Sequence, residues 1–123
     1  MILVDTSVWV DHPCRGDRIL AGILDTGRVL AHPFVIGELA LGGLRAPVLE
    51  LLHELPRAAV ATDGEVLHFI DRYGLSGGGV GYVDVHLLAS AQLTAGTCLW
   101  THDKRLQSVA AQFALAASFP LAD

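Results

Sequence analysis

Short, continuous apolar runs alternate along the chain with longer stretches in which apolar positions recur at helical spacing. Continuous apolar runs of this length are typical of strands buried on both faces, and they predict strands at 2–4, 28–31, 58–61, 98–101 and 116–119. Helical spacing is typical of helices that bury one face. Together with proline, glycine and capping residues near the ends, it predicts helices at 19–24, 33–44, 47–55, 62–74, 82–96 and 102–114, with Asp17 available near the start of the first.

The alternation of strands with helices predicts an α/β fold. Since a crossover between parallel strands places its helix on a sheet face, we expect a central parallel sheet of four to five strands with helices on both faces. The chain has 123 residues, which suits one compact domain and is too short for two. We therefore expect residues 1–123 to form a single domain with an α/β/α sandwich architecture.

Composition narrows the class of protein. Hydrophobic residues make up 52% of the chain and charged residues 17%, which favours a well-filled core. No apolar run reaches the roughly 18 residues of a membrane span, and no basic stretch precedes the first apolar run, as it would in a secretory signal. Cys14 and Cys98 are far apart and match no metal or redox spacing. These features favour a reduced, cytoplasmic location without a membrane partner.

The net charge limits how the protein can bind nucleic acid. Its formal value is −5, which argues against a broad basic surface that holds nucleic acid by charge alone. It leaves open a nucleic-acid enzyme whose positive charge comes from a bound metal ion or from a partner.

Four acidic residues stand in surroundings that contain few other charges. Asp5 is the only charged residue among the first ten, Glu38 and Asp84 each interrupt a long uncharged stretch, and Asp103 follows the apolar strand CLWT. None of the eight Lys and Arg residues lies within these apolar runs. An apolar setting is costly for a carboxylate unless it is protonated, bound by N–H donors or bound to a metal ion. A divalent cation can serve all four together, because Mg²⁺ and Mn²⁺ prefer carboxylate oxygens.

The predicted topology brings these four residues to one edge of the sheet. Asp5 and Asp103 follow strands at their carboxyl ends, where open parallel sheets bind ligands. Glu38 and Asp84 lie on helices that can cover the same crevice, and Asp84 is in a first helical turn, whose dipole favours negative charge. Simpler interpretations exist for each residue: two N-caps, a first-turn acid and a solvent-facing glutamate. One shared metal site explains the whole pattern better than four separate roles.

Two hydroxyl residues lie close to these acids in the sequence. Ser7 is two residues from Asp5, and Thr101 is two residues from Asp103. Hydroxyls there can hold a metal-bound water or orient a carboxylate, so both are supporting residues of the candidate site. Capping or turn hydrogen bonds explain them at least as well. His102 can touch a substrate, although a surface role is favoured.

Four motifs in order make the chain resemble a known family. DTSVW, GELALG, GVGYVDVHLLASA and LWTHDKRL are similar to stretches of PIN-domain ribonucleases, specifically the VapC-type toxins of bacterial toxin–antitoxin pairs. The match covers almost the whole chain, and the last two stretches are the more specific ones. One departure is the glycine-rich segment SGGGVG, where related sequences often carry a basic residue.

The resemblance implies a fold, an activity and partners. It implies a PIN-like α/β/α sandwich in which Asp5, Glu38, Asp84 and Asp103 form the acidic metal-binding quartet. It implies an endoribonuclease that depends on Mg²⁺ or Mn²⁺, cleaves RNA, is silenced by a cognate VapB-type antitoxin and usually forms a homodimer. Attack by water rather than by the ribose 2′-hydroxyl would leave a 5′-phosphate and a 3′-hydroxyl.

Three other interpretations are weaker. The segment SGGGVG lacks the Lys-Ser/Thr of a phosphate-binding P-loop and does not follow a strand as GxGxxG. A receiver-type phosphoacceptor domain has a similar length, but it needs an acidic neighbour beside Asp5 and a lysine after a late strand, and Lys104 lies in a different place. A catalytically silent PIN-like interaction module is disfavoured because all four acids of the quartet are present.

Overall fold

Three short strands form the centre of the computed structural model, which describes residues 1–15 and 18–119. They are β1 (Ile2–Val4), β2 (Val29–Leu30) and β3 (Cys98–Trp100). The order is β2-β1-β3 and both pairings are parallel, so the first strand of the chain lies in the middle. The parallel sheet predicted from the apolar runs is therefore confirmed at its three central runs.

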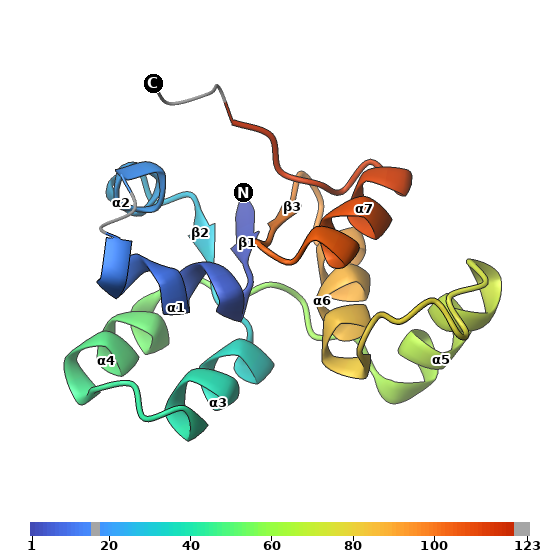
Figure 1. Ribbon diagram of the computed structural model, residues 1–123, viewed down its shortest axis with the longest axis horizontal. Coiled ribbons are helices and arrows are strands. Elements are labelled where there is room, and N and C mark those ends of the chain that lie inside the picture. Colours follow the sequence, from blue (N-terminus) through green and yellow to red (C-terminus); the bar gives the residue numbers. More distant parts are fainter. Residues whose placement is uncertain (16–17, 120–123) are drawn as a thin grey trace.

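Helices flank this sheet on both sides. In the described residues they are α1 (Thr6–Arg15), α2 (Arg18–Asp25), α3 (Pro33–Leu41), α4 (Ala46–Glu54), α5 (Asp63–Arg72), α6 (Tyr82–Leu93) and α7 (Lys104–Gln112). Figure 1 shows α1 to α4 on one side of the strands and α5 to α7 on the other. α6 packs against β3 and α5, whereas α3 packs against α1 and α4. The predicted α/β class with helices on both sides is confirmed.

The sheet is smaller than the predicted four to five strands, because the described residues contain three. The run at 58–61 is not a strand: a single parallel bridge joins Ala31 to Arg57, and the chain then leaves the sheet. Ala58 and Ala61 are buried, but the two residues between them are exposed. The continuous burial of β1 and β2 is therefore missing here.

The run at 116–119, at the opposite edge of the sheet, is likewise not a strand. A single parallel bridge joins Leu99 to Ala116, supported by backbone hydrogen bonds from Leu99 N–H to Leu115 and from Ala117 N–H to Leu99. None of the residues from 115 to 119 is fully buried. One bridged pair at each edge thus replaces the two outer strands that the apolar pattern predicted.

Most predicted helices are present within a few residues of their expected ends. α5 begins with a capping box in which Thr62 accepts from the Glu65 amide and Glu65 accepts from the Thr62 amide. α1 was not predicted, and Pro13 within it weakens the helical pattern of the sequence. Asp17, the expected cap of the next helix, lies outside the described residues.

The core lies where the sheet meets the helices on either side. Its largest fully buried side chains include Leu3 and Leu99 on the strands and Leu87 and Leu88 on α6. α6 is buried almost all round from Val85 to Ala91, which explains its uniformly apolar sequence. No helix in the described part of the chain has the length and apolar character needed to cross a membrane.

Candidate metal centre at the carboxyl edge of the sheet

Asp5 is the first residue after β1, and its side chain is only 6% exposed. Its amide N–H donates to the Trp100 carbonyl at 2.9 Å, which fixes the backbone against β3. Its Oδ2 accepts hydrogen bonds from Ser7 Oγ at 2.7 Å and from Thr101 Oγ1 at 2.8 Å. Within the described residues no donor reaches Oδ1, so this second oxygen is available to a cation.

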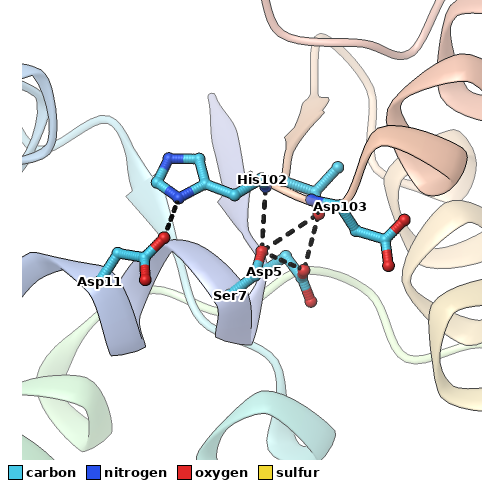
Figure 2. A network of polar contacts seen from close by, with 6 residues as sticks. Asp5, Ser7, Asp11, His102 and Asp103 are labelled. Carbon is cyan, nitrogen blue, oxygen red and sulfur yellow. Dashed lines mark hydrogen bonds and ion pairs between the residues drawn. The ribbon is translucent and has the colours of Figure 1, made fainter.

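The two hydroxyls join two distant segments of the chain (Figure 2). Thr101 Oγ1 accepts from the Asp103 amide at 3.0 Å, and Ser7 Oγ accepts from the His102 amide at 3.0 Å. The hydroxyl oxygens of Ser7 and Thr101 are 3.2 Å apart. Ser7 and Thr101 therefore orient the Asp5 carboxylate, as one interpretation of these hydroxyls proposed, and Thr101 also makes a turn hydrogen bond to the Asp103 amide, as the other proposed.

Asp103 is the N-cap of α7, as the simpler interpretation of this residue proposed, but only one of its two carboxylate oxygens makes the capping hydrogen bond. Oδ1 accepts from the Leu106 amide at 3.0 Å, and the side chain is exposed. Figure 2 shows its carboxyl group on the side of the loop away from the His102 ring. A capping carboxylate is held in a fixed orientation, and the second oxygen stays open to a ligand.

Glu38 lies in the second half of α3 and is exposed, as the solvent-facing interpretation proposed. Its Oε1 nevertheless accepts a hydrogen bond from Thr6 Oγ1 at 2.6 Å. This contact holds Glu38 beside the first turn of α1, directly after Asp5. The sequence pattern gave Thr6 no role, and its only signal was its position between Asp5 and Ser7 in DTSVW.

Asp84 lies in the first turn of α6 and is partly buried. Its pKa is raised to about 6, first by burial and then by the negative charges of Asp5, Asp103 and, more weakly, Glu38; the Gly81 amide opposes the shift. The structure thus brings all four acids close enough for each of the other three to act on Asp84. No nearby cation contributes to this shift.

The described residues provide no basic partner for the quartet. Among the side chains that the structure describes (residues 1–11 and 18–119), no Lys or Arg forms an ion pair with an Asp or Glu, and the two ion pairs found there both involve histidine. One joins His86 to Asp63 at 4.0 Å, and the other joins His102 Nδ1 to Asp11 Oδ2 at 2.6 Å. Four carboxylates without a counter-ion repel one another, and a cation bound among them would remove that repulsion.

The donor set fits a hard divalent cation that keeps much of its water. Across the described residues, no three Asp, Glu, His or Cys side chains are arranged closely enough to hold a metal ion between them. Mg²⁺ usually takes only one or two protein carboxylates, with waters and substrate phosphates completing its shell. A set made of carboxylates alone, with no His or Cys, suits Mg²⁺ or Mn²⁺ better than zinc.

His102 lies at the rim of this site. Its ring is bound by Asp11 through Nδ1, and it points toward α1 rather than toward Asp103 (Figure 2). The contact connects the segment after β3 to the second half of α1. This agrees with the favoured surface role of His102, and the Asp11 partner was not predicted because the two residues are far apart in sequence.

Two surface hollows flank different parts of the fold. A hollow of about 200 Å³ includes Glu38 and is otherwise lined by Val10, Leu39, Gly42, Gly43 and Leu44. A hollow of about 480 Å³ lies between α5 and α6 and contains none of the four acids. The roomier hollow is therefore separate from the four acids of the candidate site.

Comparison with known proteins agrees with this geometry. The family model of the PIN domain matches residues 2–112. Two relatives, both named Ribonuclease VapC32, come from the Mycobacterium tuberculosis strains CDC 1551 / Oshkosh and ATCC 25618 / H37Rv. Each is 46% identical to this chain over 118 residues, which cover 94% of this chain and 95% of the relative.

Proposed function

The chain belongs to the PIN domain family, and from that premise we propose that it is an endoribonuclease that hydrolyses RNA with Mg²⁺ or Mn²⁺ and acts as the toxin of a toxin–antitoxin pair. The proposal takes residues 1–123 as one PIN domain. It is supported by relatives named as ribonucleases at 46% identity. The observation that carries it is the convergence of three negative charges on the half-buried Asp84.

Two oxygens of the site are best placed to hold the cation. Asp5 Oδ1 and the free oxygen of Asp103 have no hydrogen-bond donor in the described residues, and their partner oxygens are fixed by Ser7, Thr101 and the Leu106 amide. Glu38 and Asp84 add ligation directly or through water. When bound, a divalent ion lowers the pKa of a coordinated water and offsets the negative charge of the phosphate.

Asp84 is the residue best suited to accept a proton from the attacking water. It lies in the first turn of α6 among the other three acids, and no side chain of the described residues donates to its carboxylate, so the carboxylate is free to accept a proton. Glu38 is less suited because it is exposed and already accepts from the Thr6 hydroxyl. Water attack leaves a 5′-phosphate and a 3′-hydroxyl.

The alternatives have less support. A receiver-type phosphoacceptor domain is a different family from the one matched over residues 2–112. A silent PIN-like module would have no need for an Asp5 carboxylate held by two hydroxyls and left with one open oxygen. The cleavage experiment below decides between the silent and the active module.

The partners follow from the same proposal. We take the antitoxin to be of the VapB type and to place a Lys or Arg among the four acids, because the metal-free site is strongly negative and lacks a basic partner in the described residues. Homodimerisation is proposed for the apolar surface around α3 and α4, where Leu41 is 92% and Leu51 is 41% exposed. The proposed location is the cytoplasm, where such a toxin meets its RNA.

The first test is RNA cleavage with and without metal. The purified chain is expected to cut single-stranded RNA in Mg²⁺ or Mn²⁺, to stop when the metal is chelated, and to leave 5′-phosphate ends. Asp5→Asn and Asp84→Asn are each expected to lower the cleavage rate about 100-fold or more, because each removes a charge of the shared site.

Asp63→Asn is the matched control, since Asp63 is also an acid in the first turn of a helix but lies outside the quartet. It is expected to cleave at close to the parent rate. Cleavage that persists in chelator, or products with 2′,3′-cyclic phosphate ends, would contradict the proposed reaction.

A further inference from the structure

Two basic residues follow Asp103 directly at the start of α7. Lys104 and Arg105 are both exposed, and neither forms an ion pair with a carboxylate of the described residues. Surface cations often have no partner, so exposure alone says little. Arg105 is nevertheless distinguished by a contact with the segment that leads into α6.

Arg105 packs its guanidinium against the glycine loop, defined here as residues 75–81. A Cβ atom added to Gly79 would overlap Arg105 Nη1 and would lie 2.9 Å from Cζ and 3.3 Å from Cδ. The side chain therefore lies along the loop backbone and occupies the space that a side chain at position 79 would fill. Gly79 has a φ of +79°, which is also a conformation that favours glycine.

This contact places the guanidinium between the elements that carry two acids of the quartet. Arg105 is two residues after Asp103, and Gly79 is two residues before Gly81, whose added Cβ would lie 3.5 Å from Asp84 Oδ2. The guanidinium is nevertheless held apart from both carboxylates, since it pairs with neither. Arg105 thus packs on the loop that leads to Asp84 and pairs with neither carboxylate, so its guanidinium remains free to bind an anion brought by the substrate.

We propose that Arg105, steadied by Gly79, binds a phosphate of the RNA backbone adjacent to the bond that is cleaved. The inference rests on the proposed ribonuclease function and adds the residue that holds the substrate. RNA approaching this site meets four carboxylates on a chain of net charge −5, so affinity requires a local cation besides the metal. A guanidinium suits this role because it stays charged and can bind two phosphate oxygens at once. Arg105 is thus a substrate-binding residue and takes no part in the chemical step.

The test measures cleavage of a random-sequence, single-stranded RNA by the full chain in Mg²⁺ or Mn²⁺. Arg105→Gln is expected to raise KM about five- to twenty-fold and to leave kcat close to the parent value. The contact with the phosphate stabilises the bound substrate and the transition state equally, so its loss weakens binding without slowing the chemical step. The slope of log affinity against log salt concentration should fall by about 0.7, the value for one phosphate contact on a single strand. Arg105→Lys should recover part of the affinity.

Two matched controls separate this role from loop structure and from general charge. Arg28→Gln removes an exposed arginine just before β2, at the opposite edge of the parallel sheet, and should leave KM unchanged. Gly79→Ala should raise KM because it displaces the guanidinium. Gly77→Ala imposes the same strain at a φ of +75° with open space around the added Cβ, so it should leave KM near the parent value.

The outcomes separate failure of this inference from failure of the proposed function. If the parent chain cleaves RNA and Arg105→Gln leaves both KM and the salt slope unchanged, Arg105 does not bind the substrate. A fall in kcat at constant KM, or equal effects of Gly79→Ala and Gly77→Ala, would likewise overturn the inference. Absence of cleavage by the parent in either metal would instead reject the proposed ribonuclease.

Discussion

At the scale of single residues, the site combines rigid positioning with uncompensated charge. Asp5 is held by two hydroxyls, Asp103 by an amide of the helix that it caps, and Glu38 by Thr6. Asp84 has no such side-chain partner among the described residues, and burial together with its acidic neighbours raises its pKa to about 6. Functional sites commonly carry a cost in stability of this kind, which a ligand then offsets.

Replacing Asp84 should therefore stabilise the metal-free fold at neutral pH. Since its folded pKa of about 6 lies above the ordinary 3.8, the folded chain holds the proton more tightly, and stability falls as pH rises through that window. At pH 7.5 in chelator, Asp84→Asn should increase the free energy of unfolding by about 1 to 3 kcal/mol. Urea denaturation should show this gain vanishing below pH 4, and a variant less stable than the parent at pH 7.5 would contradict the charge argument.

The sequence singles out some residues of the candidate site but not the contacts that hold them. Asp5, Glu38, Asp84 and Asp103 are visible because an isolated acid in an apolar run is unusual in any sequence. The Thr6 contact to Glu38 and the Asp11 contact to His102 were not predictable, because each depends on how distant segments meet. The same holds for Arg105, whose contact with Gly79 joins the first turn of α7 to a loop that the apolar pattern cannot place.

At the scale of elements, a buried histidine caps the start of α3, the helix that carries Glu38. The N-cap of α3 is His32, whose Nδ1 accepts from the Phe34 amide at 3.1 Å while Nε2 contacts Ser90 Oγ at 3.0 Å. An acceptor at Nδ1 places the proton on Nε2, so Ser90 accepts and the neutral ring satisfies both neighbours. Burial, followed by electrostatic interaction with His86 and with Arg57, lowers the pKa of His32 to about 4.

Protonation of His32 should accordingly destabilise the start of α3. Its folded pKa of about 4 lies below the ordinary 6.5, so its contribution is complete above pH 6.5 and is lost as pH falls toward 4. The loss reaches up to about 3 kcal/mol. Over nearly the same pH range, the contribution of Asp84 to stability changes in the opposite direction. The experiment should therefore be done in the Asp84→Asn variant, where this contribution is absent.

In that background, chemical denaturation should show stability falling from pH 6.5 to pH 4, and adding His32→Asn should flatten the profile. Asparagine keeps an N-cap acceptor but does not titrate, which makes it the appropriate replacement. A profile that stays equally steep after His32→Asn would assign the acid sensitivity to other groups.

Element boundaries also show why the sheet was overestimated. The runs at 58–61 and 116–119 have strand-like composition, yet the second contributes one bridged residue, Ala116, and the first contributes none, because its bridge lies just before it at Arg57. The composition of a run shows which residues are apolar. It does not show whether a neighbouring strand is present to pair with them along the whole run. In the short run at 58–61, alanines supply the burial, and exposed residues separate them. The helix α1 was missed for the converse reason, since a proline lies in a segment that is nevertheless helical.

At the scale of the whole molecule, the quartet joins the two helical groups that flank the sheet (Figure 1). Asp5 directly follows β1 and Glu38 lies on α3, whereas Asp84 lies on α6 and Asp103 is the N-cap of α7. Their mutual repulsion therefore acts between the two sides of the fold. A bound cation would convert this repulsion into a connection between segments that are far apart in the chain.

Metal binding should consequently raise the melting temperature of the whole domain. A ligand that binds only the folded state at 100 times its Kd adds about 2.7 kcal/mol, which corresponds to roughly 10 °C for a domain of this size. Differential scanning fluorimetry with Mn²⁺ or Mg²⁺ should show a saturable rise in the parent and in Asp63→Asn, and little rise in Asp5→Asn or Asp103→Asn. NaCl at the same ionic strength should raise the melting temperature less, because ions that only screen charge do not bind between the two sides of the fold. Equal rises in the parent and in the quartet variants would mean that the cations act on the general surface, and the four acids would then not form a metal site.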